Sequence, residues 1–325
     1  MRLSDIPIEA TRIQEFPGPP LSALWRGDAA RWLRHHVTQP LEGAAQYGFY
    51  YLARPLPPEF PAALGQLIGP MAGYLDRKRP YVAQMRRAIG IIRPDLDAAG
   101  RAQMLDAWWR NTGISHAQFP THKALSAPGR LTVHGAARFA EGDRLGNTFY
   151  LMVHMGSWEI MSHITTRYHS REMIGIYEPQ QSRFQNRLVY AGRKRYNYYV
   201  FPPSTQLPRL MIKLFQGGCN GCFFIDEKSA GQSRFPLWGR GVPKTGNVIF
   251  LLKLAHKLGA RLQPAYLRRE SPGRSALHLL DPIPVRSDLP RDVFVRRTVR
   301  ELSALFEPVI AANLAQWYML KEMRM

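Results

Sequence analysis

A histidine and a glutamate five residues apart, His154 and Glu159, are the residues of this sequence whose types and setting best suit catalysis. They lie in the stretch NTFYLMVHMGSWEI, where an apolar strand over residues 148–153 is expected to end at the histidine and continue as a helix. The carboxyl end of a buried strand, beside a helix amino terminus, is where open α/β sheets usually place their chemistry. A histidine oriented there by a carboxylate can take a proton from a hydroxyl that attacks an acyl carbonyl.

The pairing sets a geometric condition. Residues five apart lie on different faces of one regular helix, so His154 must stand on the turn, before the helix begins. Gly156 would let the backbone approach closely, and the helix start at Ser157 would offer N–H donors to a developing oxyanion. The simpler interpretation is a histidine that ends a strand and a solvated helical glutamate, because the spacing alone has low specificity.

A second group of charged residues lies in the loop FIDEKSAGQSRFPLWGRGVPKTG. Asp226 is expected to end a strand there, and basic residues follow it: Lys228, Arg234, Arg240 and Lys244. Side chains from such a loop could hold the phosphate or carboxylate of a substrate. Arg193 and Arg195 form a third basic group, at the end of an expected helix. In both places the alternative is ordinary surface charge, since basic residues also suit the negative end of a helix dipole.

The remaining motifs exclude several classes. Cys219 and Cys222 form a single C-x-x-C, which cannot complete a tetrahedral zinc site without two further ligands and cannot staple a secreted fold. A redox or metal role for this pair is the minor alternative. The sequence contains no G-x-S-x-G, H-E-x-x-H, G-x-x-x-x-G-K-[ST] or G-x-G-x-x-G. These absences disfavour an ordinary hydrolase, a zincin or a P-loop enzyme. We expect no cofactor.

The charge of the chain indicates an anionic partner. The 325 residues include 44 Lys and Arg against 24 Asp and Glu, a net charge of +20. Nucleic acid, anionic lipid and an acidic protein or substrate would all suit it. The amino terminus lacks the pattern of a signal peptide, and no stretch reaches the roughly 18 to 20 apolar residues that span a bilayer. We therefore expect a soluble or surface-bound protein.

Strand and helix patterns alternate through most of the chain, which predicts an α/β fold with a mostly parallel central sheet flanked by helices. A turn is expected at residues 141–143, Asp95 as a helix cap, and a final helix broken near Pro308. Strands are expected at residues 131–133, 148–153, 173–177, 198–201, 222–225, 261–267 and 276–280.

Residues 1–80 form a region of their own in this reading. Residues 60–75 are apolar, and the basic cluster Arg77, Lys78 and Arg79 follows. Such a helix suits a membrane interface beside anionic headgroups, so we expect a helical, membrane-associating extension before a domain at residues 81–325. The alternative is that these apolar faces pack on the following domain.

The stretch LMVHMGSWEI resembles the H-x-G-N-W-E block of the bacterial lipid A biosynthesis acyltransferases, the lauroyl/myristoyl type, within the glycerolipid acyltransferases that carry an H-x4-D/E signature. From about residue 85 to 320, further stretches resemble that family in the same order: RPDLDAAGRAQMLDAWWRNTG, YEPQQSRFQNRLVYAGRKR, GGCNGCFFIDEKSAGQSRFPLWGRGVPKTGN and LAQWYML.

The resemblance implies acyl transfer, without metal, from acyl carrier protein or acyl-CoA to a hydroxyl of a lipid A precursor. It places the protein peripherally or monotopically on the cytoplasmic face of a bacterial inner membrane. His154 would be the general base and Glu159 its orienting partner, with Arg193 matching the family's G-R-x-R and Asp226 its strand-end aspartate. Ser157 stands where the family has asparagine, the usual amino-terminal membrane span is missing, and the closing motif has Met319-Leu320.

Two alternatives stay open. The acceptor could be another membrane lipid or glycolipid, or the chain could be a non-catalytic protein of the same fold that binds anionic lipid or nucleic acid. An acidic carrier protein and an anionic membrane surface both suit the net charge of +20, which favours these partners over nucleic acid.

Overall fold

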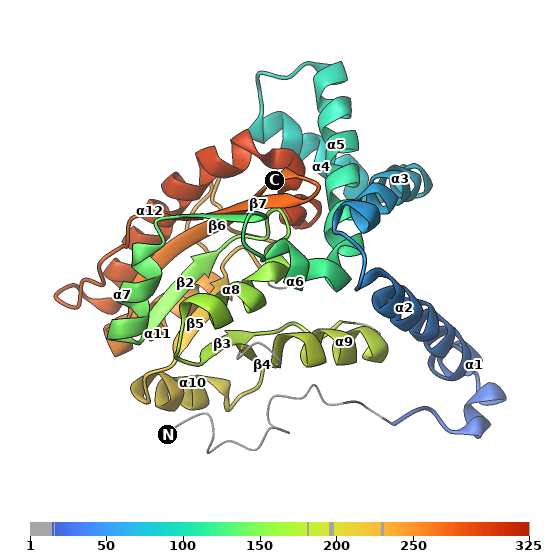
Figure 1. Cartoon of the computed structure of the whole chain (residues 1–325), viewed down its shortest axis with the longest axis horizontal. Coiled ribbons are helices and arrows are strands. Elements are labelled where there is room, and N and C mark those ends of the chain that lie inside the picture. The colour runs from blue at the N-terminus through green and yellow to red at the C-terminus, as the bar shows by residue number, and fades with distance from the viewer. Residues whose placement is uncertain (1–14, 16, 181, 195–197, 229–230, 325) are drawn as a thin grey trace.

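The computed structural model describes residues 15, 17–180, 182–194, 198–228 and 231–324. Its centre is a seven-stranded sheet with the order β1-β7-β6-β2-β5-β3-β4 (Figure 1). β6 and β7 pair antiparallel, and the other neighbouring strands pair parallel, so the predicted α/β class and mostly parallel sheet are confirmed. The strands are β1 (Leu131–His134), β2 (Thr148–Met152), β3 (Met173–Ile176), β4 (Tyr198–Phe201), β5 (Asn220–Phe224), β6 (Arg261–Ser271) and β7 (Arg274–Leu279).

Helices cover both faces of this sheet. Every residue of β2 is buried, and because successive residues point to opposite faces, both faces of the strand must be covered. Phe149 and Leu151 face the core shared with α4, α5, α10, α11 and α12, whereas Tyr150 and Met152 face the core under α6, α7, α8 and α9. The helices are α1 (Ala29–Leu33), α2 (Gln39–Ala53), α3 (Glu59–Asp76), α4 (Pro80–Ile92), α5 (Ala98–Ala117), α6 (His122–Leu125), α7 (Ala137–Leu145), α8 (Met161–Tyr168), α9 (Arg183–Lys194), α10 (Leu207–Gln216), α11 (Asn247–Leu258) and α12 (Arg291–Ala312).

Three local expectations were wrong. Residues 141–143 lie in α7 and not in a turn, because the helix closes over the sheet with Phe139 buried beneath it. α12 runs through Pro308, since its buried stripe continues to Ile310 on the far side of the proline. Asp97, and not Asp95, caps α5, because its carboxylate accepts the Gly100 N–H at 2.7 Å.

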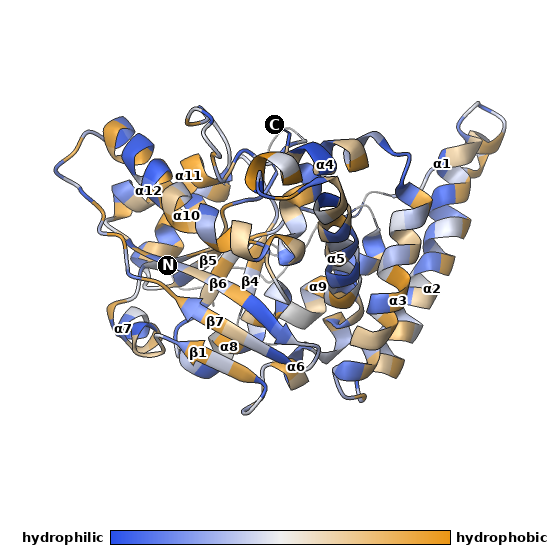
Figure 2. Ribbon diagram, turned by 90° about the horizontal axis from the view of Figure 1, so that it is seen from above, coloured by the Kyte–Doolittle hydropathy of each residue, from blue (hydrophilic) through white to orange (hydrophobic). Residues whose placement is uncertain are grey.

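The amino-terminal helices α2 and α3 stand to one side of the sheet, with α5 between α3 and the sheet (Figure 1). α3 packs on α5 through glycines: a Cβ at Gly65 or Gly69 would collide with the backbone of Gly113 or Trp109. The opposite face of α3 is apolar and exposed, and Figure 2 shows apolar colour along much of the helix. The packing alternative therefore holds for the inner face of α3, and membrane association through the outer face stays a prediction.

The exposed apolar side chains of α3 recur at helical spacing: Phe60, Leu64, Leu67, Ile68, Met71 and Leu75. Among the described residues, no helix is long and apolar enough to cross a membrane.

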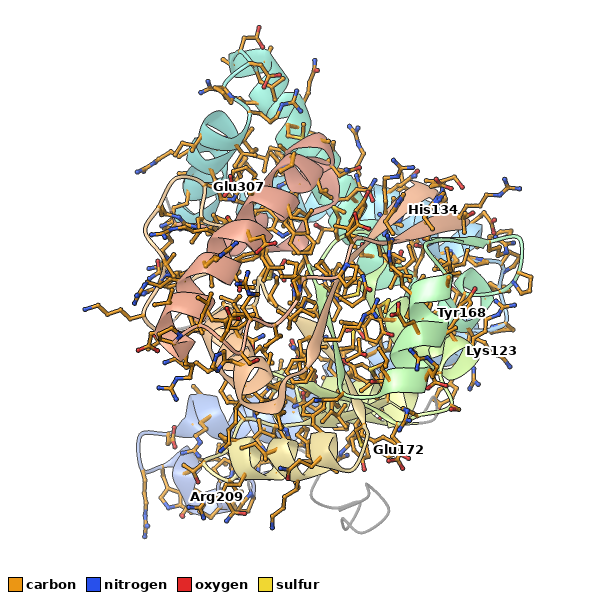
Figure 3. All side chains as sticks on the ribbon, turned by 90° about the vertical axis from the view of Figure 1, so that its left-hand side faces the viewer. Lys123, His134, Tyr168, Glu172, Arg209 and Glu307 are labelled. Carbon is orange, nitrogen blue, oxygen red and sulfur yellow. The ribbon has the colours of Figure 1, made fainter. Side chains whose placement is uncertain are left out.

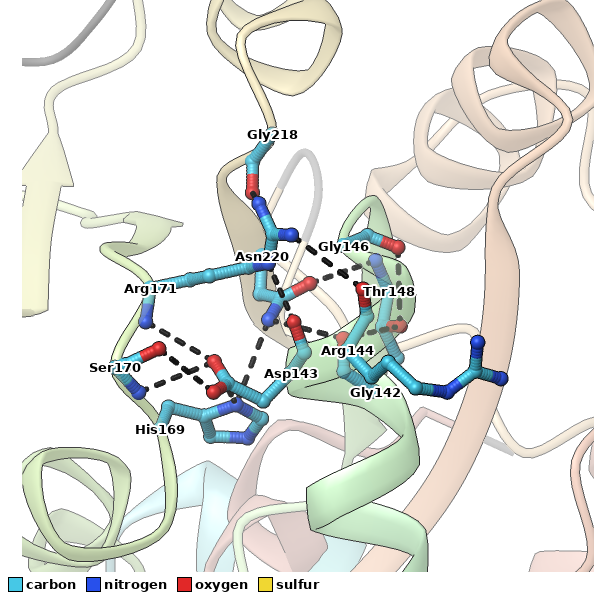
Figure 4. A network of polar contacts seen from close by, with 10 residues as sticks. All are labelled: Gly142, Asp143, Arg144, Gly146, Thr148, His169, Ser170, Arg171, Gly218 and Asn220. Carbon is cyan, nitrogen blue, oxygen red and sulfur yellow. Dashed lines mark hydrogen bonds and ion pairs between the residues drawn. The ribbon is translucent and has the colours of Figure 1, made fainter.

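A polar network ties together the amino-terminal ends of the central strands (Figure 4). Asp143 of α7 accepts hydrogen bonds from the Ser170 and Arg171 N–H groups at 3.1 and 3.0 Å, and lies 3.3 Å from His169 Nδ1. Asn220, at the start of β5, accepts the Thr148 N–H at 2.9 Å. These contacts fix the edge of the sheet opposite the candidate site.

Candidate active site

The site begins where β2 and β5 end. The two strands are parallel neighbours, and Met152 pairs with Phe224. His154 and Asp226 each follow two residues later, so the pairing register alone brings them to one edge of the sheet. His154 Nδ1 lies 2.8 Å from Asp226 Oδ1, and the His154 backbone N–H donates to Asp226 Oδ2 at 2.9 Å.

The closing Gln-Trp motif completes this pair from the far end of the chain. Trp317 Nε1 donates to Asp226 Oδ2 at 2.8 Å, and the next residue, Tyr318, donates its N–H to the His154 carbonyl at 2.8 Å. Trp317 is fully buried, and its own carbonyl accepts Trp108 Nε1 of α5 at 2.8 Å. Asp226 is a buried carboxylate, and among the described residues its oxygens accept from the ring and backbone N–H of His154 and from the Trp317 indole.

The surroundings of His154 favour its charged form. Burial lowers the pKa of His154, but the charge of Asp226 and its hydrogen bond outweigh burial, with smaller contributions from Glu227 and Glu159, so the pKa lies above its usual range. With Nδ1 donating to Asp226, Nε2 carries the lone pair. Nε2 lies 3.6 Å from Glu227, and the His154 side chain is 12% exposed. This arrangement makes Nε2 a strengthened base that substrate can reach.

The turn after His154 is held from below by β6 and α5. Gly156 has a φ of 62°, and a Cβ there would lie 3.0 Å from the Arg269 N and the Leu267 carbonyl, which explains the glycine. Its N–H donates to the Gln316 carbonyl at 3.2 Å. Arg269 is buried, donates to Ser157 Oγ at 3.0 Å and to Ser115 Oγ at 2.7 Å, and has its pKa lowered to about 9 by burial.

His154 lines a cavity of about 1420 Å³. One part of the wall is apolar and could accept a hydrocarbon chain. Its apolar side chains include Ile176, Leu188, Val189, Leu207, Phe223, Phe224 and Phe250. The positively charged side chains in the described wall are Arg34, Lys228 and Lys321. The negatively charged ones are Glu42, Glu159, Glu178, Glu227 and Glu322. The wall thus carries more carboxylates than cations in a chain whose net charge is +20.

Glu159, predicted to orient His154, lies in the wall of this cavity. It raises the pKa of His154 less than Asp226 and Glu227 do. The ring Nδ1 donates its hydrogen bond to Asp226, a residue of the predicted substrate-binding loop. The structure therefore places a carboxylate just after β5 against the ring, and the pairing of His154 with Glu159 stays a prediction.

Of the basic loop, the structure brings Lys228 into the cavity wall. Arg234 and Lys244 are exposed and lie outside the described lining. Arg240 donates to the carbonyls of Pro236, Leu237 and Arg324, so it ties the loop to the carboxyl terminus. Glu307 of α12, labelled in Figure 3, fixes the same loop by accepting the Trp238 N–H at 2.8 Å.

The other predicted residues lie elsewhere. Gly156 and Ser157 form the turn itself, and Ser157 Oγ accepts a hydrogen bond from Arg269. Neither residue belongs to the described cavity lining. Arg195 and the side chain of Arg193 fall outside the described part of the chain. Cys219 and Cys222 are both buried free thiols, and burial raises the pKa of Cys219 to about 12, which makes it unreactive.

The sequence did not predict the contacts that hold His154. The strand-end position of Asp226 and the closing motif at Trp317 were visible signals, but nothing in the pattern linked either residue to His154. Arg269 carried no signal, since a basic residue near the end of a strand is usually exposed.

The arrangement is one that suits acyl transfer: a histidine is held by a buried carboxylate at the carboxyl edge of a mostly parallel sheet and lines a part-apolar cavity. The sequence profile of the bacterial lipid A biosynthesis acyltransferases matches residues 36–323. The chain therefore belongs to the bacterial lipid A biosynthesis acyltransferase family, and it is an acyltransferase that acts on lipid A-type substrates. A comparison with individual curated proteins gave no match. Membership in this family decides against the non-catalytic alternative.

Proposed function

We propose that this protein moves a fatty acyl chain from acyl carrier protein, or from acyl-CoA, to a hydroxyl of a lipid A precursor, with His154 as general base. The observation that carries this proposal is the His154–Asp226 contact of 2.8 Å at the mouth of a cavity of about 1420 Å³. In the reaction, His154 Nε2 takes the proton of the acceptor hydroxyl while its oxygen attacks the thioester carbonyl. When the intermediate collapses, the carbon–sulfur bond breaks and the thiolate takes that proton from His154.

Asp226 holds the ring so that Nε2 faces the cavity, and its charge stabilises the imidazolium that forms. The apolar wall around Phe223 and Phe250 accepts the acyl chain. Glu159 adds negative charge on the cavity side and assists the same proton transfer.

The test is transfer of a labelled acyl chain from acyl carrier protein or CoA to a lipid A precursor in mixed micelles. We expect the purified protein to form the acylated lipid and His154→Ala to lose about 10²- to 10⁴-fold in rate. Mass spectrometry of membrane lipids with and without the protein identifies the acceptor in the cell. Unchanged transfer by His154→Ala would sink the mechanism.

A second acceptor class is favoured by the charge of the cavity wall. Glutamates outnumber lysines and arginines among its described residues. Carboxylates bind sugar hydroxyls and amines better than phosphates, so a glycolipid or aminolipid head is the alternative acceptor. Competition between a phosphorylated and an unphosphorylated acceptor in the same assay separates the two.

We further propose that the protein works on the cytoplasmic surface of the inner membrane and docks there through the outer face of α3. Leu67, Met71 and Leu75 of that face are 68%, 64% and 77% exposed. The basic cluster Arg77, Lys78 and Arg79 follows at the end of the helix, where anionic headgroups would meet it. The positive charge of the protein also suits the acidic carrier protein.

Vesicle flotation tests this surface. We expect binding to vesicles rich in phosphatidylglycerol and loss of binding in the double variant Leu67→Glu/Met71→Glu. Leu145→Glu is the matched control, since Leu145 is 49% exposed at the end of α7, away from α3. Equal binding of all three proteins would rule out docking through α3.

A further inference from the structure

The cavity contains a second histidine besides the proposed base. His116, in the last turn of α5, lines the same cavity as His154. Both imidazoles lie edge-on to one indole: the ring centroid of Trp158 is 5.7 Å from that of His154 and 6.3 Å from that of His116. Tyr318 also packs edge-on against His116, with centroids 5.5 Å apart, and its ring lies 4.9 Å from that of Trp158. The ring of His116 is thus held by two aromatic neighbours that touch each other, one of which also contacts His154.

His116 has its hydrogen-bonding groups available. Its contacts with the described residues are those ring contacts, and no hydrogen bond to its imidazole is formed there. Partial desolvation lowers the pKa of His116, although the residue keeps an exposed surface, the nearby charge of Lys321 lowers this pKa further, and Glu159 opposes both effects. A neutral imidazole carries one N–H and one lone pair at neutral pH. His116 therefore presents a donor to the cavity without competing for the proton that His154 takes.

Two groups of the turn are already engaged. The Gly156 N–H donates to the Gln316 carbonyl at 3.2 Å. The Ser157 hydroxyl lies between Arg269 and Gln118. The helix that follows, Trp158–Ile160, is a single short turn. A donor on another element that lines the same cavity would add to the stabilisation of an oxyanion in front of His154.

We propose that His116 is a catalytic residue that donates a hydrogen bond to the carbonyl oxygen of the acyl thioester and stabilises the oxyanion of the tetrahedral intermediate. This inference rests on the proposed acyl transfer. The proton of the acceptor hydroxyl passes to His154, the acceptor oxygen bonds to the acyl carbon, and the carbonyl oxygen becomes the oxyanion that accepts the N–H of His116. The carbon–sulfur bond then breaks, the thiolate takes the proton from His154, and His116 ends in its starting state. A neutral imidazole with a lowered pKa is suited to polarise a carbonyl in this way.

The experiment compares full-length variants in the acyl-transfer assay with acyl-CoA as donor. His116→Phe keeps an aromatic ring against Trp158 and Tyr318 but removes the N–H, and we expect its kcat to fall about 10²- to 10³-fold with little change in KM. His116→Gln keeps a neutral N–H donor, and we expect it to stay within about tenfold of the original kcat. His134→Phe is the control, because His134 is exposed on β1 and stacks on His278, outside the described cavity lining.

The outcomes separate the two proposals. If the unaltered protein transfers acyl chains, His154→Ala abolishes transfer and His116→Phe matches the unaltered protein, only the role of His116 is refuted. A fall for His116→Gln as large as that for His116→Phe would also refute it. If the unaltered protein transfers nothing, the proposed function fails first.

Folding and pH provide two further checks. Should His116→Phe be unfolded by circular dichroism, His116→Met takes its place, since methionine fills similar space without a donor. The acid limb of the pH–rate profile should coincide for His116→Gln and the unaltered protein, because His116 is neutral well below the pH at which His154 titrates. A displaced limb would mean that His116 transfers protons, which would overturn the proposed role.

Discussion

Two histidine–aspartate pairs lie at opposite ends of one sheet, His154 with Asp226 at the carboxyl ends of β2 and β5, and His169 with Asp143 at the amino-terminal side. The first contact is 2.8 Å long and the second 3.3 Å. The His154 side chain is 12% exposed, toward the cavity, whereas that of His169 is fully buried. The residue types are the same, but the surroundings differ.

The pKa values follow from those surroundings. Burial lowers the pKa of both histidines, but for His154 the charge of Asp226 outweighs burial and the pKa rises. For His169 burial prevails over Asp143 and the pKa falls. The Asp143 carboxylate is shared with the Ser170 and Arg171 N–H groups, and His169 Nε2 is buried without a partner among the described residues. A histidine–aspartate contact can therefore serve as a catalytic pair only under two conditions. The second ring nitrogen must be accessible to substrate, and the charge of the carboxylate must raise the pKa of the histidine more than burial lowers it.

The largest expected effect distinguishes the two aspartates. Asp226→Asn removes the charge and offers an amide to oxygens that now accept from His154 and Trp317. We expect kcat for acyl transfer to fall on the order of 10³- to 10⁴-fold, as for other histidines deprived of their carboxylate. Asp143→Asn should keep kcat per folded molecule within about twofold. Asp143 is remote from the reacting atoms, so its interactions are the same in the ground state and in the transition state. Equal losses in both variants would mean that neither pair is catalytic.

A smaller effect concerns stability. Asp143→Ala leaves the Ser170 and Arg171 N–H groups and the Ser170 hydroxyl without their charged acceptor. We expect the free energy of unfolding to fall by about 1–3 kcal/mol in urea titrations, with kcat per folded molecule unchanged. Asp281→Ala serves as the control, because Asp281 is 92% exposed and its ion pair with Arg138 should contribute below about 1 kcal/mol. An unchanged urea midpoint for Asp143→Ala would show that the network in Figure 4 does not hold the sheet edge.

The smallest effect is a shift in pH dependence. His154 must be unprotonated to act as base, so kcat/KM should rise with pH through a pKa above the usual value of about 6.5. Glu227→Gln removes a negative charge 3.6 Å from Nε2, which lowers the pKa of His154 and moves the acid limb to lower pH by less than about one unit. Glu270→Gln, at the exposed ion pair with Arg268, should leave the limb in place. A shift toward higher pH in Glu227→Gln would contradict the assignment of this limb to His154.

Much of the fold could be predicted because strand and helix periodicities are local. The strand at residues 198–201 was predicted to the residue, and the others within a few positions. The turn at residues 141–143 was wrong because its glycine, Gly142, lies inside α7, where the Tyr150 hydroxyl approaches it closely. That packing involves a strand later in the chain, so no local pattern contains it.

The sequence by itself determined the alternation of strands and helices, the histidine at the end of a buried strand, and the family block LMVHMGSWEI, because each depends on neighbours along the chain. Only the tertiary structure decided which carboxylate meets His154. β5 pairs with β2 although β3 and β4 lie between them in the chain, and strand order depends on long-range packing of helices on both faces. The same packing turned one face of α3 toward α5 and left the other exposed, and it brought His116 of α5 into the cavity that His154 lines.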